Sequence, residues 1–313
     1  MTATASGPLR PHALSVGDAI AVVAPASPPS PTRLRAGMEV LRHWGFRPRL
    51  GAHTRDVRGY LAGTDADRAA DLRAAFADPT IKAVWGARGG YGAGRIIDRL
   101  DRDAIVADPK LFIGFSDLTA VHLALADHAR IATVHAPTVA KLADLGNDEV
   151  APLLHLLSVP RPLGYVPLHD DGRTLTTMVG GRAEGRLLGG NLTMLAAACG
   201  TLTRPRFRGA IALIEEVNEV PYRVDRLLTQ LRLSGVFDGV AGIIVAHSPG
   251  CDAPGGTPRF EDVIADRLGA LGVPLLAGAP LGHGPRTRSV PLGVRVTLDA
   301  DEPSLHVIEP CTR

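Results

Sequence analysis

Short apolar runs alternate with amphipathic stretches through the first half of the chain, and this alternation restricts the possible folds more than any other feature. The apolar run at residues 19–24 leads through a Pro/Ser turn into residues 32–44, which have apolar side chains at helical spacing. A second helical stretch, 65–76, precedes a second apolar run, 81–85. Such alternation is typical of βα units. We therefore predict an N-terminal α/β domain with a mostly parallel sheet.

Two apolar runs of this half lead into loops that carry groups suited to chemistry. Residues 81–85 continue into the glycine-rich stretch 86–94, and residues 111–114 continue into Ser116 and Asp117. The carboxyl ends of parallel strands meet at one edge of a sheet, where open α/β sheets place their ligands. We therefore expect a functional site at this edge.

The second half of the chain has a different pattern. Residues 158–182 are rich in Pro, Gly, Asp and Arg without sustained periodicity, which predicts a linker. Beyond it we predict helices near 191–199 and 222–233, and strands at 210–214, 242–245, 275–277, 294–298 and 305–308. The later strands come without long helices, so this half is predicted to be β-rich.

Length favours two domains. A chain of 313 residues exceeds one typical core. We divide it into an N-terminal α/β domain (1–157), a linker (158–182) and a smaller β-rich C-terminal domain (183–313).

Composition excludes several classes of protein. The 34 basic and 32 acidic residues are spread along the chain, so no single-sign field points to nucleic acid or to an anionic membrane. Cys199, Cys251 and Cys311 lack the spacing of a disulfide framework or a structural zinc site. The start lacks the order of a secretory signal, and no apolar run is long enough to span a membrane. We expect a cytoplasmic protein without a nucleic-acid or membrane partner.

The glycine-rich stretch does not match a nucleotide-binding motif. Gly94 is followed by Arg95 and Ile96, where a P-loop requires Lys and Ser or Thr, and the dinucleotide fingerprint also fails. Dense glycines still let backbone N–H groups approach a ligand, which suits an oxyanion hole as well as a phosphate. A plain tight turn is the alternative.

Ser116 lies where a predicted strand meets a predicted helix. A serine there projects its hydroxyl above the sheet, and the N–H of Asp117 points where an oxyanion would develop. Serine is also a favoured N-cap, so its position alone leaves both roles open. The α/β-hydrolase elbow is not satisfied, because Leu118 occupies the place of its last glycine.

A serine nucleophile needs a base, and the base needs an acceptor that orients it. His283 stands between two glycines in a loop, where an imidazole stays partly exposed, and His135 is the second candidate. Glu215 and Glu216 follow an apolar run and point to opposite sides of a strand, so only one can serve as the acceptor. Capping the helix that follows them is their alternative role. Metal-ligand spacings do not occur, and we expect no metal site.

Several segments together resemble the LD-carboxypeptidase family of serine peptidases, which includes the microcin C immunity peptidases. The resemblance covers most of the chain, and the order and spacing of its segments match the family. These segments are residues 17–18 and 22–25, 60–65, 87–92, 114–119, 188–192, 214–216, 221–226 and 282–283.

The resemblance implies a site that forms only when the two domains meet. It implies Ser116 as nucleophile, His283 as base and Glu215, which directly follows the strand, as orienting carboxylate. The backbone N–H groups of Gly90 and Asp117 would form the oxyanion hole. It implies no cofactor, and it implies a homodimer.

The resemblance further implies hydrolysis of the amide between the L-centre of a diamino acid and a terminal D-alanine in cytoplasmic muropeptide tetrapeptides, a step of cell-wall recycling. Arg88 and Asn191 are candidates for binding the polar substrate, with loop ordering as their alternative role.

Two other functions remain open at this point. A peptidyl-nucleotide antibiotic as substrate would need an aromatic side chain that stacks on its base, and the predicted linker offers only Tyr165. A non-catalytic protein that binds a small ligand between two lobes is the alternative from another class.

Overall fold

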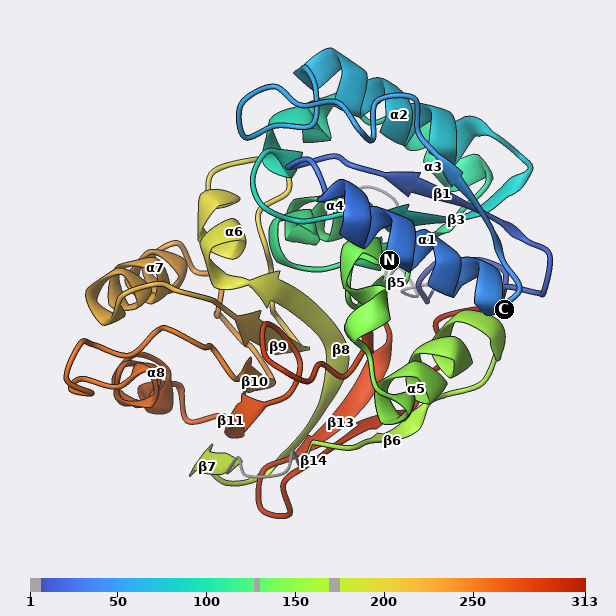
Figure 1. Ribbon diagram of the computed structural model, residues 1–313. Helices are drawn as coiled ribbons and strands as arrows, with labels where there is room; N and C mark the ends of the chain where they lie inside the picture. Colours follow the sequence, from blue (N-terminus) through green and yellow to red (C-terminus); the bar gives the residue numbers. More distant parts are fainter. Residues whose placement is uncertain (1–6, 127–129, 169–174) are drawn as a thin grey trace.

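Two β-sheets with helices packed against them form the molecule (Figure 1). The structure is a computed structural model that describes residues 7–126, 130–168 and 175–313. Within these ranges the first sheet has the strand order β12–β5–β4–β3–β1–β2. Its strands are β1 (Ala19–Val23), β2 (Arg47–Leu50), β3 (Ile81–Gly86), β4 (Leu111–Gly114), β5 (Thr133–His135) and β12 (Val290–Leu292). Neighbouring strands are parallel except β12 with β5, so the predicted mostly parallel α/β sheet is confirmed.

The helices of the first half pack around this sheet. They are α1 (Pro31–His43), α2 (Asp65–Ala77), α3 (Arg102–Ala107), α4 (Thr119–Ala124) and α5 (Asn147–Ser158), with 3₁₀ turns at Ala93–Arg99, Ser116–Leu118 and Val139–Asp144. α1 and α2 lie where the spacing of apolar residues predicts helices. A capping box starts α2, because Thr64 Oγ1 accepts from the N–H of Asp67 and the Asp67 carboxylate accepts from the N–H of Thr64.

The second sheet has the order β6–β14–β13–β8–β9–β10–β11–β7. Its strands are β6 (Gly164–Val166), β7 (Thr176–Val179), β8 (Arg182–Asn191), β9 (Ala210–Glu215), β10 (Gly242–Ala246), β11 (Leu275–Ala279), β13 (Arg295–Asp299) and β14 (Ser304–Val307). The central strands β8 to β11 are parallel and the outer pairs are antiparallel. The helices of this half are α6 (Leu192–Ala197), α7 (Pro221–Leu233) and α8 (Phe260–Leu268). In Figure 1, α7 and α8 lie beside β9 to β11.

Three segments differ from the sequence-based expectation. The predicted linker contributes β6 and β7 to the second sheet, and the predicted second domain contributes β12 to the first sheet. These strands have three or four residues, which is too short for a period-two pattern to show. Their partners are also distant along the chain. The third segment is α8, a helix between two strands where long helices were not expected.

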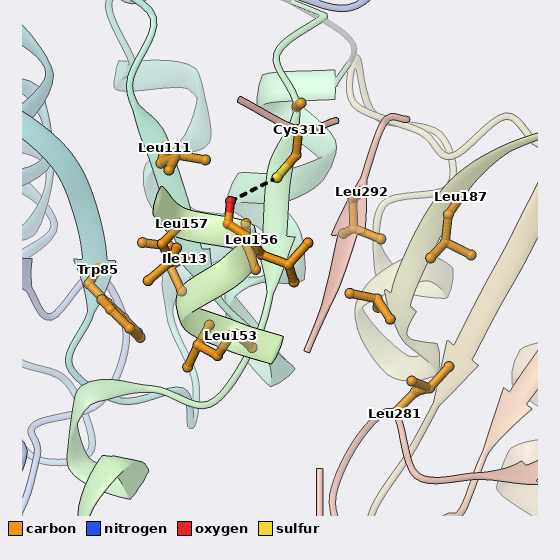
Figure 2. Close-up of a cluster of buried hydrophobic side chains, with 14 of the residues drawn as sticks. Trp85, Leu111, Ile113, Leu153, Leu156, Leu157, Leu187, Leu281, Leu292 and Cys311 are labelled. Atoms are coloured by element: carbon orange, nitrogen blue, oxygen red, sulfur yellow. Dashed lines mark hydrogen bonds between the residues drawn. The ribbon is translucent and has the colours of Figure 1, made fainter. Parts of the chain in front are cut away.

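One apolar core continues from the first sheet to the second. Figure 2 shows Trp85 of β3, Leu153 of α5 and Leu187 of β8, all fully buried members of one cluster. Burial of side chains of this size contributes about 1.5–3 kcal/mol each. The same figure shows the thiol of Cys311 donating a hydrogen bond to the carbonyl of Leu156 at 3.2 Å. Because the sheets share this core, their strand ends keep a defined relation, which positions the site.

The three cysteines carry free thiols, and Cys311 and Cys251 are buried. Across the described ranges, no helix is both long enough and apolar enough to cross a membrane.

Candidate active site

Ser116 begins a 3₁₀ turn directly after β4 and has an uncommon backbone conformation. Its backbone φ is 64°, in the left-handed region that residues other than glycine rarely adopt. A non-glycine residue in this region has a strained backbone. Residues of this kind are kept only where the surrounding structure holds them, and they cluster at functional sites. The serine side chain caps neither this turn nor α4. The N-cap role that the sequence left open is therefore not observed.

Leu118 explains how this turn packs against the sheet. A Cβ on Gly86 would lie 2.1 Å from Leu118 Cδ1, and a Cβ on Gly114 would lie 2.4 Å from the same atom. Two glycines at the ends of β3 and β4 thus leave the space that the leucine fills. The side chain that replaces the last glycine of a hydrolase elbow anchors the turn that presents Ser116.

The glycine-rich stretch lies against Ser116. A Cβ on Gly89 would be 3.0 Å from Ser116 Cβ and 3.5 Å from the backbone nitrogen of Asp117. Gly90 has a φ of 104°, and a Cβ there would meet Ser27 Oγ at 2.3 Å, so a side chain does not fit. The N–H groups of Gly90 and Asp117 donate to no backbone acceptor in the described chain. Both predicted oxyanion-hole donors thus belong to segments that meet at Ser116.

The Asp117 carboxylate holds the end of this stretch. Its Oδ2 accepts a hydrogen bond from the N–H of Ala93 at 2.8 Å. Burial raises the pKa of the Asp117 carboxyl to about 6, although hydrogen bonds from the backbone of Ala93 and Gly92 and the charge of Arg68 lower it. The side chain of Asp117 therefore orders the glycine-rich stretch, while its backbone N–H remains the predicted oxyanion-hole donor.

Glu215 and His283 form a hydrogen-bonded pair. Glu215 is the last residue of β9 and is fully buried, and the Nδ1–H of His283 donates to its Oε2 at 2.5 Å. Burial would raise the pKa of the Glu215 carboxyl, but the hydrogen bond and the charge of His283 outweigh it, so the pKa lies below its ordinary value. The His283 ring keeps one-fifth of its surface exposed. This arrangement leaves Nε2 as the imidazole nitrogen that can exchange a proton.

Phe115 and Gly282 bring this pair to the serine. The Phe115 ring, which precedes Ser116, packs on the His283 ring with centroids 4.7 Å apart. A Cβ on Gly282 would lie 2.7 Å from Glu215 Cβ, so the loop approaches the strand end as only glycine allows. The Glu215–His283 pair, from β9 and the loop after β11, thus lies against the residue that directly precedes Ser116. Sequence reasoning did not single out Phe115, because an aromatic residue after a strand gives no signal of its own.

Glu216 does not cap the helix that follows it, which was the alternative role of this carboxylate pair, because no side chain in the described part of the chain caps α7. Its side chain accepts from the Asn191 amide at 2.9 Å and from the N–H and hydroxyl of Thr193 at 2.9 and 2.7 Å. It stabilises the start of α6, which precedes it in the chain. The choice of Glu215 as the partner of His283 agrees with this geometry.

The candidate substrate-binding residues are engaged in the local structure. The Asn191 amide donates to Glu216, and its oxygen accepts from the N–H of Met194 at 3.2 Å as the N-cap of α6. Arg88 is exposed and donates to the carbonyl of Pro28 at 2.8 Å. A contact of either residue with substrate stays a prediction.

His135, the second candidate base, is fully buried behind the site. Its Nε2 contacts the carbonyl of Leu281 at 2.8 Å, two residues before His283. Burial lowers the pKa of His135, so the ring is neutral and Nε2–H is the donor. His135 therefore positions the loop that carries His283 and is not itself reached by solvent.

One group in the described ranges has the spacing of metal ligands. It comprises His53, Asp56 and Asp67, whose ligand atoms lie within 4.8 Å of one another. His53 already hydrogen-bonds Asp56 at 2.8 Å, and Asp67 belongs to the capping box of α2. These contacts account for the cluster without an ion.

Comparison with known proteins shows the family of this chain. Residues 20–136 match the LD-carboxypeptidase N-terminal domain, and residues 184–298 match the LD-carboxypeptidase C-terminal domain. The chain belongs to the LD-carboxypeptidase family. It is accordingly a serine-type carboxypeptidase.

Its relatives in sequence include three bacterial proteins. A putative carboxypeptidase of Streptomyces coelicolor is 42% identical over 308 residues, covering 96% of this chain and 97% of the relative. A probable murein peptide carboxypeptidase of Bacillus subtilis is 36% identical, with 94% and 92% covered. A murein tetrapeptide carboxypeptidase of Pseudomonas aeruginosa is 33% identical, with 90% and 93% covered.

Solved structures show the same fold in two kinds of LD-carboxypeptidase relative. The microcin self-immunity protein MccF in complex with glutamyl sulfamoyl guanosine superposes with a TM-score of 0.90 at 26% identity, covering 98% of this chain and 100% of that one. A muramoyltetrapeptide carboxypeptidase from Oxalobacter formigenes has a TM-score of 0.78 at 26% identity, with 92% and 97% covered.

Proposed function

We propose that Ser116, His283 and Glu215 form a catalytic triad that removes the terminal D-alanine from muropeptide tetrapeptides by cleaving the L,D-amide before it. The hydrogen-bonded pair of Glu215 and His283, whose imidazole packs on the Phe115 ring next to Ser116 in the chain, supports this proposal. The murein tetrapeptide carboxypeptidase of Pseudomonas aeruginosa, 33% identical to this chain, supports the substrate.

The reaction is acyl transfer in two steps. Ser116 Oγ attacks the amide carbonyl while His283 Nε2 takes its proton, and the N–H groups of Gly90 and Asp117 stabilise the oxyanion that forms. His283 then gives the proton to the amine of the leaving D-alanine. A water attacks the acyl-enzyme, again with His283 as base, and releases the shortened peptide and Ser116.

Glu215 stabilises the charged form of His283 during both steps. Its carboxylate is buried, ionised and hydrogen-bonded to Nδ1, so it fixes the imidazole with Nε2 toward the reaction. Its negative charge also balances the imidazolium that forms when Ser116 loses its proton. No cofactor is needed for this chemistry, since the proton and the nucleophile come from side chains.

Hydrolysis of a peptidyl-nucleotide is the second candidate. The TM-score of 0.90 to MccF favours it. The stacking partner that the sequence offered, Tyr165, is 46% exposed, and its ring packs on that of His306 with centroids 5.4 Å apart. The non-catalytic binding protein has no support, because family membership and the strained serine both favour catalysis.

The deciding experiment is mass spectrometry of a muropeptide tetrapeptide incubated with the wild type and with Ser116→Ala at matched concentration. We expect the wild type to release D-alanine, and the variant to be slower by about a millionfold. Circular dichroism establishes that both proteins are folded. If folded wild type releases no D-alanine but cleaves a peptidyl-nucleotide, the muropeptide assignment is wrong and the second candidate holds.

We also propose that the protein acts in the cytoplasm as a homodimer. The free thiols of Cys199, Cys251 and Cys311 agree with a reducing compartment. Sedimentation equilibrium tests the dimer, since a single species of monomer mass across micromolar concentrations would contradict it.

A further inference from the structure

We propose that a pocket next to the glycine-rich stretch binds an oxyanion, a phosphate or a carboxylate, carried by the acyl part of the substrate. The pocket has a volume of about 500 Å³ and is lined by residues of the loop before α2, the first turn of α2 and the turn at Ala93–Arg99. The inference rests on the proposed function, because it assigns this pocket to the substrate of Ser116.

Positive charge dominates the lining of this pocket. Arg58, Arg95 and Arg99 contribute guanidinium groups, and Asp65 is the one carboxylate among the described lining residues. Arg95 donates to Asp65 at 2.9 Å, but Asp65 also pairs with the buried Arg68, so two arginines share its charge. Guanidinium groups bind phosphates and carboxylates through paired N–H donors.

Arg58 and Arg99 are the groups that remain for a ligand. Both side chains are exposed, and neither forms a side-chain hydrogen bond or an ion pair with a residue in the described ranges. Hydrogen bonds from Thr64 and, to a smaller extent, the charge of Arg58 lower the pKa of the nearby Asp67 carboxyl, but the three arginines of the lining outnumber its one carboxylate, and a bound anion would offset that excess. The pocket is thus electrostatically complementary to an oxyanion.

The glycine-rich stretch connects the pocket wall with Ser116. A Cβ on Gly92 would lie 2.5 Å from Leu61 Cδ2 in the pocket wall, and Arg68 holds the Gly92 carbonyl at 2.7 Å. Gly89, three residues earlier, packs on Ser116. One short segment therefore faces Ser116 at one end and the pocket at the other.

An exposed aromatic pair joins the pocket to the glycine-rich stretch. Tyr60 lines the pocket, and its ring meets that of Tyr91 edge to face with centroids 5.5 Å apart. The side chains are 63% and 53% exposed, which is high for aromatic rings that pack on each other. Tyrosine offers both an apolar face and a hydroxyl, as surfaces that bind ring-bearing or peptide ligands do.

The size of the pocket assigns it to the acyl side of the scissile bond. Under the proposed function the leaving group is a single D-alanine, which is far too small to fill a pocket of 500 Å³. The acyl part, the rest of the peptide with whatever is attached to it, has the required length. An oxyanion on that part is the group that Arg58 and Arg99 would bind.

Binding to catalytically inactive protein tests this without relying on turnover. In the Ser116→Ala background, calorimetry compares two pairs of ligands: a tetrapeptide carrying a sugar with or without a phosphate, and a tetrapeptide with its internal carboxylates free or amidated. We expect the anionic member of at least one pair to bind more tightly, and Arg58→Gln with Arg99→Gln to weaken its binding about 10- to 100-fold while the neutral member is unaffected. The pair that responds identifies the oxyanion as phosphate or carboxylate.

The matched control is Arg35→Gln with Arg42→Gln, which removes the same charge from two exposed arginines of α1. If both double variants weaken anion binding equally, the effect is long-range charge and the pocket is not the site. If neither pair of ligands is discriminated before substitution, the inference is wrong. Failure of wild type to release D-alanine would contradict the proposed function alone, because the calorimetry does not require cleavage.

Discussion

The Nδ1–H of His283 donates a hydrogen bond to Oε2 of Glu215 over 2.5 Å and so joins the loop after β11 to the end of β9. The carboxylate is fully buried, and its other oxygen, Oε1, has no hydrogen-bond partner in the described chain. A buried carboxylate that depends so strongly on one imidazole is sensitive to any change that moves that imidazole. The first two predictions follow from this dependence.

Glu215→Gln should lower kcat for D-alanine release about 100- to 10,000-fold, because the amide removes the charge that balances the imidazolium of His283. Steady-state kinetics on folded protein measures this. Glu216→Gln is the matched control: it should lower the free energy of unfolding by weakening the start of α6, and leave kcat within about tenfold. Equal losses of kcat in the two variants would contradict the assignment of Glu215.

Gly282→Ala should lower kcat at least tenfold, since its Cβ would lie 2.7 Å from Glu215 Cβ and must displace the loop that carries His283. Gly269→Ala provides the comparison, because a Cβ there meets nothing within 4 Å. Steady-state kinetics of both variants measures the effect, and thermal unfolding checks that both are folded. Full activity of Gly282→Ala would contradict this account.

Ser116→Gly should be more stable than Ser116→Ala by about 1–2 kcal/mol, although both lack the nucleophile. The reason is the φ of 64° at this position, which glycine adopts without strain and alanine does not. Urea denaturation of the two inactive variants measures the difference. Equal midpoints and slopes would mean that the turn is not strained in solution.

Asp117→Asn should change how stability depends on pH. Burial raises the pKa of this carboxyl from 3.8 to about 6, so between these values the native state holds a proton that the unfolded state has released. The free energy of unfolding of the wild type therefore decreases as pH rises through this window, by about 3 kcal/mol from this group. The variant lacks this contribution.

The measurement for Asp117 is urea denaturation of both proteins at pH values from 4 to 7. The difference in unfolding free energy, variant minus wild type, should increase across this range and level off above the folded pKa. A difference that stays constant with pH would show that Asp117 titrates as it does in the unfolded chain.

Much of the fold could be predicted because the strands and helices of the first sheet have local patterns of apolar residues. Residues 19–24 are a continuous apolar run and residues 81–85 are apolar except for the exposed Lys82, as nearly fully buried strands require, and they became β1 and β3. Prediction failed for β12, a three-residue strand whose partner β5 lies more than 150 residues earlier. Pairing over such a separation leaves no trace in the periodicity of a short segment.

The candidate site shows the same division. Ser116, Glu215 and His283 could be selected from strand ends, glycine contexts and the order of segments along the chain, since these are properties of short stretches. The sequence could not decide whether His135 is a base or a buried structural residue, because a histidine in either role has the same sequence context. The structure decided for the structural role. Burial lowers the pKa of His135, and its Nε2 is hydrogen-bonded to the Leu281 carbonyl.

The sequence by itself determined the alternation of strands and helices, the glycines that allow close approach and the residue types of the triad. Only the tertiary structure decided that His135 is buried, that Glu216 holds the start of α6 and where the pocket lined by Arg58, Arg95 and Arg99 lies. The reason is that backbone conformation depends on neighbouring residues, whereas burial and charge pairing depend on the shared core that brings distant strand ends together.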